Sequence, residues 1–136
     1  MTKSIEFYFD FISPYAFLAY KKLKSLNKNE IINIIYKPIF LGGLHKLSEI
    51  TPPAFNERKM KNMKNDCELI AIKNYINFKW NTNFPINSLY LMRGYLVMNK
   101  QFQKKFFDIC FDSYWKNDMD ISKEENLNKI LKMVGF

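Results

Sequence analysis

The first forty residues change hydrophobic period twice. Residues 4–9 alternate apolar and polar positions and are rich in aromatic and β-branched residues, which predicts a strand. Pro14 then opens residues 14–27, where apolar side chains recur every three or four positions, as in a helix. Residues 30–37 carry isoleucines on both faces, which is typical of a strand buried between helical layers. This order of elements predicts a parallel, right-handed βαβ unit.

A helical period dominates the rest of the chain. The sequence FLGGL at residues 40–44 predicts a glycine-broken turn, and TPPA at residues 51–54 predicts a stop followed by a helix start. Four further helices are predicted, at residues 54–75, 87–99, 101–116 and 122–134. The predicted core stripes are Tyr15, Leu18, Ala19, Leu23 and Leu26 in the helix at 14–27, and Met60, Met63, Cys67, Ile70 and Ala71 in the helix at 54–75.

The last predicted helix has a signal at each end. Ser122 and Glu125 have the spacing of a capping box, and Gly135 stands where a C-terminal cap is expected.

Only two strands are predicted in the whole chain, and a two-stranded parallel sheet is too small to be stable by itself. We therefore expect a sheet that is incomplete within these residues.

Composition indicates one globular domain. The chain has 136 residues, of which 48% are hydrophobic, enough for a core without metal or disulfides. The net charge of +8 comes from lysines spread along the chain rather than from a basic block. Such a field favours anionic small molecules or polyanions. The aromatic residues fall at helical core spacings rather than on strands that stack bases, so we expect no nucleic-acid partner.

The cysteines and the histidine do not have the spacing of a metal site. Cys67 and Cys110 are far apart and neither belongs to a CxxC pair, while His45 is the one histidine. We expect no metal, and we interpret both cysteines as small buried hydrophobic residues. The N-terminus lacks the pattern of a secretory leader, and no apolar run has membrane-spanning length. These features favour a cytoplasmic protein without a membrane partner.

Ser13 is the polar side chain most favourably placed for chemistry. It follows a strand and precedes a helix, where free N–H groups and the helix dipole stabilise an anion or a thiolate. From local sequence alone, we interpret Ser13 as a helix N-cap, with a catalytic role as the alternative. Asp10 is interpreted as a turn-forming residue, with a role as carboxylate partner as the alternative.

Two other features have structural and functional interpretations. His45 follows two glycines and is interpreted as an exposed loop residue, with a role as catalytic base as the alternative. The segment at residues 57–66 interleaves basic side chains with methionines, which is typical of a solvated amphipathic helix face. One lysine from that face could bind a carboxylate ligand.

Several motifs together resemble one known family, the 2-hydroxychromene-2-carboxylate isomerases and kappa-class glutathione transferases. They occur in the order and approximate spacing of that family and span nearly the whole chain. The motifs are FYFDFISPYAFLAY at 7–20, YKPIFLGGL at 36–44, TPPAFNERKM at 51–60, FPINSLYLMRGYL at 84–96 and WKNDMDIS at 115–122.

The resemblance implies an α/β fold of the thioredoxin-like, DsbA type with a large helical insertion. Residues 1–44 would form the N-terminal βαβ half, and residues 45–136 the helical insertion, within a single domain. Relatives continue into a further ββα portion, which we expect to be absent from residues 1–136. This expectation agrees with the two-strand prediction reached from periodicity.

The resemblance also assigns site residues. Ser13 corresponds to the serine of the family's SPY motif, which replaces a redox cysteine and hydrogen-bonds the sulfur of glutathione, with Pro14 and Tyr15 beside it. Lys59 ends the PPx(5)K pattern, which implies contact with a glutathione carboxylate. The positions implied to lie near the ligand are Phe11, Ile50, where many relatives have asparagine, and Arg93.

The function that the resemblance implies is glutathione-dependent isomerisation or conjugation. Glutathione would be the co-substrate and an aromatic carboxylate the other small molecule. A different class of function is an inactive remnant or half-domain that binds a C-terminal complementing chain or forms a homodimer through an open strand edge. A third is disulfide exchange as in DsbA-like proteins, which the absence of CxxC disfavours.

Overall fold

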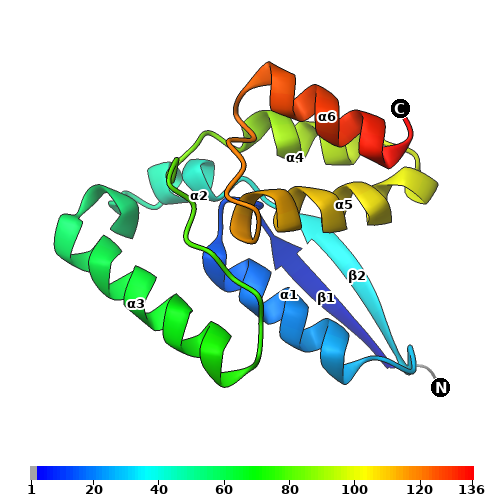
Figure 1. Cartoon of the computed structure of the whole chain (residues 1–136), viewed down its shortest axis with the longest axis horizontal. Coiled ribbons are helices and arrows are strands. Elements are labelled where there is room, and N and C mark those ends of the chain that lie inside the picture. Colours follow the sequence, from blue (N-terminus) through cyan, green and yellow to red (C-terminus); the bar gives the residue numbers. More distant parts are fainter. Residues whose placement is uncertain (1–2) are drawn as a thin grey trace.

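Two parallel strands and the helices that pack on them make up the computed structural model, which describes residues 3–136 (Figure 1). The elements in chain order are β1 (Lys3–Phe9), α1 (Pro14–Leu26), β2 (Ile32–Pro38), α2 (Leu41–Leu47), the short 3₁₀ helix η1 (Pro53–Phe55), α3 (Glu57–Lys73), α4 (Leu89–Val97), α5 (Lys100–Trp115) and α6 (Glu124–Val134). The predicted combination of a βαβ unit and a long helical part is therefore confirmed.

The βαβ unit is parallel, as predicted. Lys3 pairs with Ile32 at one end of the ladder, and Phe9 pairs with Pro38 at the other. Asn27 ends α1 and fixes the start of β2. Its side-chain amide donates to the carbonyl of Ile32 at 2.8 Å, and its amide oxygen accepts from the N–H of Ile32 at 2.9 Å. This double contact explains why β2 begins at Ile32 and not at residue 30.

Helix α1 forms where expected but buries a different face from the predicted stripe. Leu18 is 3% exposed, whereas Leu26 is 75% exposed and Ala19 also faces solvent. The side chains that α1 buries are Pro14, Phe17, Leu18 and Tyr20. Aromatic packing decides this rotation, because Phe17 and Tyr20 contact rings of α5 and of the segment after α3.

The glycine-broken turn predicted at residues 40–44 is wrong, because α2 begins there. The Asp10 carboxylate, at the end of β1, accepts the first helical N–H of α2, from Leu41, at 2.8 Å. The glycines let the helix pack tightly on Phe40: a Cβ added at Gly43 would lie 2.8 Å from that ring. A side chain from another element thus caps a helix that local sequence does not indicate.

The four later helices are confirmed, with shifted ends. The predicted start at residue 54 is divided, because η1 occupies Pro53–Phe55 and α3 begins only at Glu57. Asn56 marks that start, since its side-chain oxygen accepts from the N–H of Lys59 at 3.0 Å. The predicted stripe of α3 meets the core through Cys67 and Ala71, which are buried, with Met63 and Ile70 partly buried against them.

The predicted capping box of α6 is wrong, and its predicted C-terminal cap is confirmed. Lys123 occupies the N-cap position without a side-chain bond, while the Ser122 hydroxyl donates to Asp120 at 2.5 Å. Gly135 has φ of 107°, and its N–H reaches the carbonyl of Leu131 at 3.1 Å. Because the Ser122 side chain bonds Asp120 in a competing turn, it does not cap the first turn of α6 as the capping box requires.

The core is mainly aromatic and joins the strands to the helical part. Phe9 on β1 lies edge-on to Phe107 on α5, with 4.7 Å between ring centroids. Trp115 at the end of α5 is fully buried and donates its indole N–H to the carbonyl of Phe11 at 2.9 Å. The prediction that the aromatic residues serve packing is confirmed for these rings. Because the rings come from both halves of the sequence, the βαβ unit and the helices share one core.

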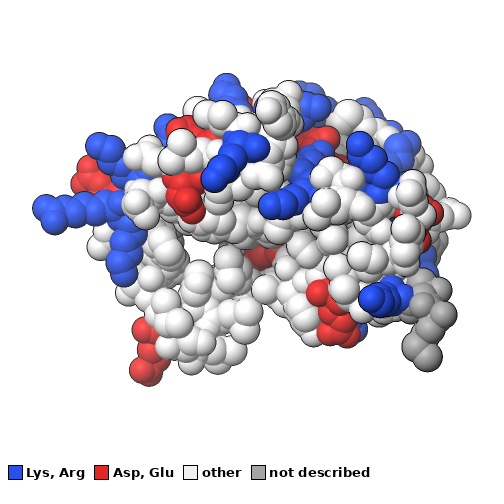
Figure 2. Space-filling view, turned by 90° about the horizontal axis from the view of Figure 1, so that it is seen from below, with Lys and Arg blue, Asp and Glu red and all other residues white. Residues whose placement is uncertain are grey.

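The surface distribution of charge is uneven. Figure 2 shows a hollow between two lobes on the lower side of the molecule, with mainly uncharged residues around it, while lysine and arginine side chains gather above it and at the left. Within residues 3–136, none of the helices has the length and apolarity needed to cross a membrane.

The first prediction uses two leucines of the same helix. Leu18→Ala removes a buried side chain and should lower the free energy of unfolding by about 2–5 kcal/mol, since it leaves a cavity in a packed core. Leu26→Ala, at the exposed end of α1, should change it by about 0.5 kcal/mol or less. Urea unfolding followed by circular dichroism measures both. Equal losses would contradict the observed rotation of α1.

Candidate functional site

A cavity of about 510 Å³ lies beside the start of α1. Its volume is within the range of small-molecule sites. Its walls come from α1, α2, η1, α3 and the segment before α4, and consist of Ile12, Ser13, Pro14, Tyr15, Phe40, Leu41, Gly42, His45, Pro52, Pro53, Ala54, Phe55, Met63, Phe84, Pro85, Ile86, Asn87 and Ser88. Most of these side chains are apolar, so the few polar ones determine what the cavity binds.

Ser13 caps α1 at the edge of this cavity. Its hydroxyl oxygen accepts the N–H of Ala16 at 3.1 Å, and its backbone lies in the extended region expected of an N-cap. The loop before it is a tight turn, because the N–H of Ser13 donates to the carbonyl of Asp10 at 3.0 Å. The interpretation of Ser13 as a cap is therefore confirmed.

Capping leaves the Ser13 hydroxyl able to act on a ligand. A serine hydroxyl has one proton to donate and two lone pairs that accept. The bond from Ala16 uses a lone pair, so the proton remains available to an anion or a thiolate in the cavity. Capping and ligand binding are therefore compatible at this residue.

The two residues after Ser13 shape the same corner. Pro14 is buried at the first helical position, where its missing N–H costs nothing. Tyr15 lines the cavity, and its hydroxyl donates to the Asp66 carboxylate on α3 at 2.8 Å. Burial and the bond to Asp66 raise the pKa of Tyr15, so its phenol stays neutral. Three predicted positions thus meet at one end of the cavity.

Asp10 holds three parts of the cavity wall together. One carboxylate oxygen accepts the N–H of Ile12 at 3.1 Å, and the other accepts the N–H of Leu41 at 2.8 Å. The Ser88 hydroxyl also hydrogen-bonds this carboxylate. Burial raises the pKa of Asp10, and these bonds oppose that effect. The turn-forming role predicted for Asp10 is confirmed, and tertiary contacts extend it to α2 and the start of α4.

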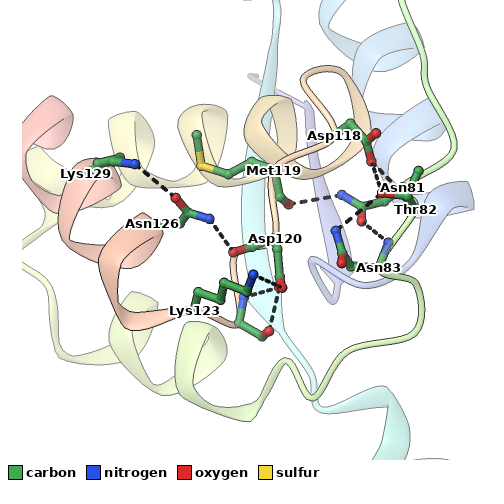
Figure 3. A network of polar contacts seen from close by, with 10 residues as sticks. Asn81, Thr82, Asn83, Asp118, Met119, Asp120, Lys123, Asn126 and Lys129 are labelled. Carbon is green, nitrogen blue, oxygen red and sulfur yellow. Dashed lines mark hydrogen bonds and ion pairs between the residues drawn. The ribbon is translucent and has the colours of Figure 1, made fainter.

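Residues 84–88, which line the same cavity as Ser13, are positioned by a buried amide. Asn81 donates its side-chain N–H groups to the carbonyl of Tyr114 at 2.8 Å and to that of Met119 at 3.0 Å. Figure 3 shows the contact with Met119. Beside it, Asp118 accepts the N–H of Thr82 at 2.7 Å. The segment then turns into the cavity wall with a cis peptide bond between Phe84 and Pro85. These bonds attach the wall to the end of α5 and the loop after it.

The interpretation of His45 as an exposed loop residue is wrong. It lies in α2, is only partly exposed, and lines the same cavity as Ser13. Sequence reasoning also missed Phe40 and the segment at residues 84–88 as cavity walls. The motif FPINS at 84–88 contained a signal for an ordered loop, because proline, asparagine and serine are common turn residues.

The remaining predicted site residues lie outside the cavity lining. Phe11 is buried in the aromatic core, where its ring contacts Phe106 and Phe111. The side chains of Ile50, Lys59 and Arg93 are exposed to solvent. Their assigned roles stay predictions that depend on the resemblance.

Thiol chemistry of the protein's own cysteines is disfavoured. Both cysteines are buried and free, as expected from the sequence. Burial raises the pKa of Cys67 to about 12 and that of Cys110 well above its usual value, which keeps both thiols protonated. Across residues 3–136, no three side chains of the metal-ligating types come together.

Comparison with known proteins assigns the fold. A family profile described as DSBA-like thioredoxin domain matches residues 4–136. The chain belongs to the DsbA-like thioredoxin family. A solved 2-hydroxychromene-2-carboxylate isomerase has the same fold as this family member, with a TM-score of 0.84 at 22% identity. The alignment covers 98% of this chain and 66% of that one.

Two curated relatives of this DsbA-like chain carry enzyme names. It is 36% identical to the 2-hydroxychromene-2-carboxylate isomerase of Sphingobium xenophagum, over all of this chain and 70% of the relative. It is 26% identical to glutathione S-transferase kappa 1 of Caenorhabditis elegans, over 96% of this chain and 62% of that protein. The chain thus spans about two thirds of the length of these relatives.

The second prediction concerns Asp10. Asp10→Asn replaces one accepting oxygen by an amide NH₂ group, which would face a backbone N–H that it cannot accept. The free energy of unfolding should therefore fall by about 1–3 kcal/mol. Asp66→Asn is the matched control, since its exposed amide oxygen still accepts from Tyr15 and stability should hardly change.

The same variant tests the titration of Asp10. Because the folded-state pKa of Asp10 is raised, the folded chain holds this proton more tightly than the unfolded chain. The contribution of Asp10 to stability therefore falls as pH rises from the unfolded pKa to the folded one. Asparagine does not titrate, so Asp10→Asn should remove this slope from unfolding curves measured across the acidic range. An unchanged slope would contradict the assignment.

Proposed function

We propose that this chain binds glutathione at Ser13 and supports glutathione-dependent isomerisation or conjugation of an aromatic carboxylate. The observation that carries the proposal is the Ser13 hydroxyl, which caps α1 with a lone pair and lies in the wall of an apolar cavity. The match to relatives named as an isomerase and as a glutathione transferase supports the same chemistry.

The role proposed for Ser13 is to stabilise the thiolate of glutathione. A hydrogen bond to a charged group contributes about 1.5–3 kcal/mol, and the start of a helix adds about 0.3–1 kcal/mol. Both effects favour the charged sulfur over the neutral thiol, so they lower the pKa of glutathione's thiol when it is bound. More thiolate is then present near neutral pH, which raises the concentration of the nucleophile.

The proposed isomerisation is an addition followed by an elimination. The thiolate sulfur forms a bond to the conjugated carbon of the substrate, and the π electrons of the carbon–carbon double bond move to the carbonyl oxygen. The former double bond is now single and rotates. The electrons then return, the carbon–sulfur bond breaks, and the thiolate leaves with the trans isomer formed. No oxidant or reductant is consumed, and Ser13 stabilises the same charge at the start and the end.

Other assignments from the resemblance complete the proposal. Lys59 would bind a glutathione carboxylate as an exposed point charge, as its solvent-facing position permits. Glutathione is abundant in reducing compartments, and two free cysteines suit such a setting, so we propose a cytoplasmic location. Disulfide exchange is not proposed, because Ser13 and Pro14 stand at the helix start and both cysteines are buried.

The third prediction tests the Ser13 hydroxyl. Ser13→Gly removes the hydroxyl but keeps a residue that tolerates the N-cap, so the fold should lose only a few tenths of a kcal/mol. The thiolate absorbance of bound glutathione near neutral pH should fall several-fold, and isomerase activity should fall with it. Ultraviolet difference spectra measure the thiolate, an isomerase assay measures the activity, and calorimetry measures the binding of glutathione.

Two further variants separate the hydroxyl from the helix. Ser13→Thr keeps a hydroxyl and a cap, so it should restore most of the thiolate signal. Ser25→Ala removes a hydroxyl from the other end of α1, where it bonds only the carbonyl of Lys22, and should change nothing. A thiolate signal in Ser13→Gly equal to that of the wild type would contradict the proposal that Ser13 stabilises the thiolate.

The sheet favours a second candidate function, a half-domain that acts with a complementing chain. Among residues 3–136 the sheet has two strands, so one edge of β1 and one edge of β2 are unpaired. Tyr8 is exposed on β1, and Ile5 and Ile35 are partly exposed on the sheet. Unpaired edges with exposed apolar side chains readily add a strand from another chain.

The fourth prediction tests this second candidate by self-association. If the strand edges are binding surfaces, the chain should associate as its concentration rises, and Tyr8→Lys should weaken that association by placing a charge on the edge strand. Sedimentation velocity across a concentration series measures both proteins. A monomer at every concentration that also unfolds cooperatively would count against a half-domain.

A further inference from the structure

His45 occupies the one face of α2 that meets the cavity. Leu41, Gly42 and His45 all line it, and their spacing of one and four positions places them on the same side of a helix. His45 belongs to the wall that includes Phe40, whereas Lys46, the next residue, is exposed to solvent. The imidazole therefore belongs to the cavity, and the neighbouring ammonium group does not.

Helix α2 holds His45 in a defined place. The Asp10 carboxylate accepts the N–H of Leu41 at 2.8 Å, which attaches the start of α2 to the end of β1. The same carboxylate bonds Ile12 in the loop that leads to Ser13. After the helix, the N–H of Ile50 donates to the carbonyl of His45 at 3.0 Å. These contacts fix the helix relative to Ser13.

The imidazole has no partner within the described chain. Over residues 3–136, no side-chain hydrogen bond or ion pair involves His45, so its ring nitrogens remain for a ligand. The other polar side chains of the cavity wall are hydroxyls, a phenol and an amide, from Ser13, Tyr15, Asn87 and Ser88. Among these side chains, His45 supplies the imidazole, whose ring N–H can donate a hydrogen bond to a carboxylate.

None of the charged groups around His45 in the described chain pairs with its imidazole. The Asp10 carboxylate, just after β1, already accepts hydrogen bonds from Ile12, Leu41 and Ser88. Lys46 and Glu49, on and just after α2, face solvent. The Tyr15 phenol on α1 donates to Asp66 on α3. No carboxylate therefore neutralises the imidazole within hydrogen-bonding distance in the described chain.

We propose that His45 binds the carboxylate of the aromatic acceptor and so selects anionic over neutral substrates. The ring of the acceptor would lie on the apolar wall formed by Phe40, Phe55 and Phe84. This inference rests on the proposed function, which it deepens by naming the residue that recognises the second substrate. In this proposal Ser13 stabilises the sulfur of glutathione, and His45 binds the carboxylate of the acceptor that this sulfur attacks.

The fifth prediction compares a bicyclic acid with its uncharged amide, 2-naphthoate and 2-naphthamide. Calorimetry of the full chain without glutathione should show the acid binding about tenfold more tightly than the amide at about pH 5.5. The preference is expected because an imidazole N–H donates a stronger hydrogen bond to a carboxylate than to an uncharged amide.

Three variants make the test specific. His45→Phe removes the donor and should bind acid and amide equally, and His45→Gln, which keeps a weaker donor, should keep only a small preference. Lys46→Gln removes the neighbouring charge outside the cavity and should behave as the wild type. Circular dichroism checks that each variant is folded.

Several results would overturn the inference. They are the absence of a preference for the acid in the wild type at about pH 5.5, an unchanged preference in His45→Phe, or loss of the preference in Lys46→Gln. Because the titration contains no glutathione, such a failure is separate from a failure of the thiolate role of Ser13, which glutathione binding measures by itself.

Discussion

The buried carboxylate of Asp10 is the constraint on which the site depends. It lies at the carboxyl end of β1 and accepts N–H groups from the loop before α1 and from the first turn of α2, and it hydrogen-bonds the serine that precedes α4. A carboxylate has several acceptor positions in a fixed plane, so one side chain orients three segments that are distant in sequence. Its burial is tolerated because each segment supplies a donor. Ser13 and His45 hold their places in the cavity as a result.

The aromatic core performs the complementary task of joining the two halves of the chain. Rings of α5 contact rings of both strands and of α1, and the indole of Trp115 bonds the carbonyl of Phe11, just before the cavity. Large flat side chains bury much surface and prefer edge-to-face contacts, so they fix angles between elements as well as distances. The cavity wall is thus attached to this aromatic core.

Local patterns predicted most of the architecture and the Ser13 corner of the site. Two periodicities, a proline at a helix start and a glycine at a helix end are each short-range signals, and all four were confirmed in β1, α1 and Gly135. The strand β2 forms as predicted, but it is not buried on both faces, because Ile35 is 39% exposed. The errors share a different physical origin. Helix α2, the open N-cap of α6 and the buried face of α1 are each decided by a partner far along the chain or by a competing turn. No window of ten residues contains the distant partners of α2 and α1, and at α6 the local turn at Asp120 competes with the capping box for Ser122.

The sequence by itself determined that Ser13 begins a helix directly after a strand, because the cap, the proline and the period are all local. It also determined the family, since several spaced motifs are matched along the chain. Only the tertiary structure decided what faces Ser13. His45 and the wall at residues 84–88 enter the cavity because Asp10 and Asn81 form hydrogen bonds with groups that lie about thirty residues away in the chain. Such bonds depend on the folded positions of both partners, and hydrophobic periodicity contains no information about them.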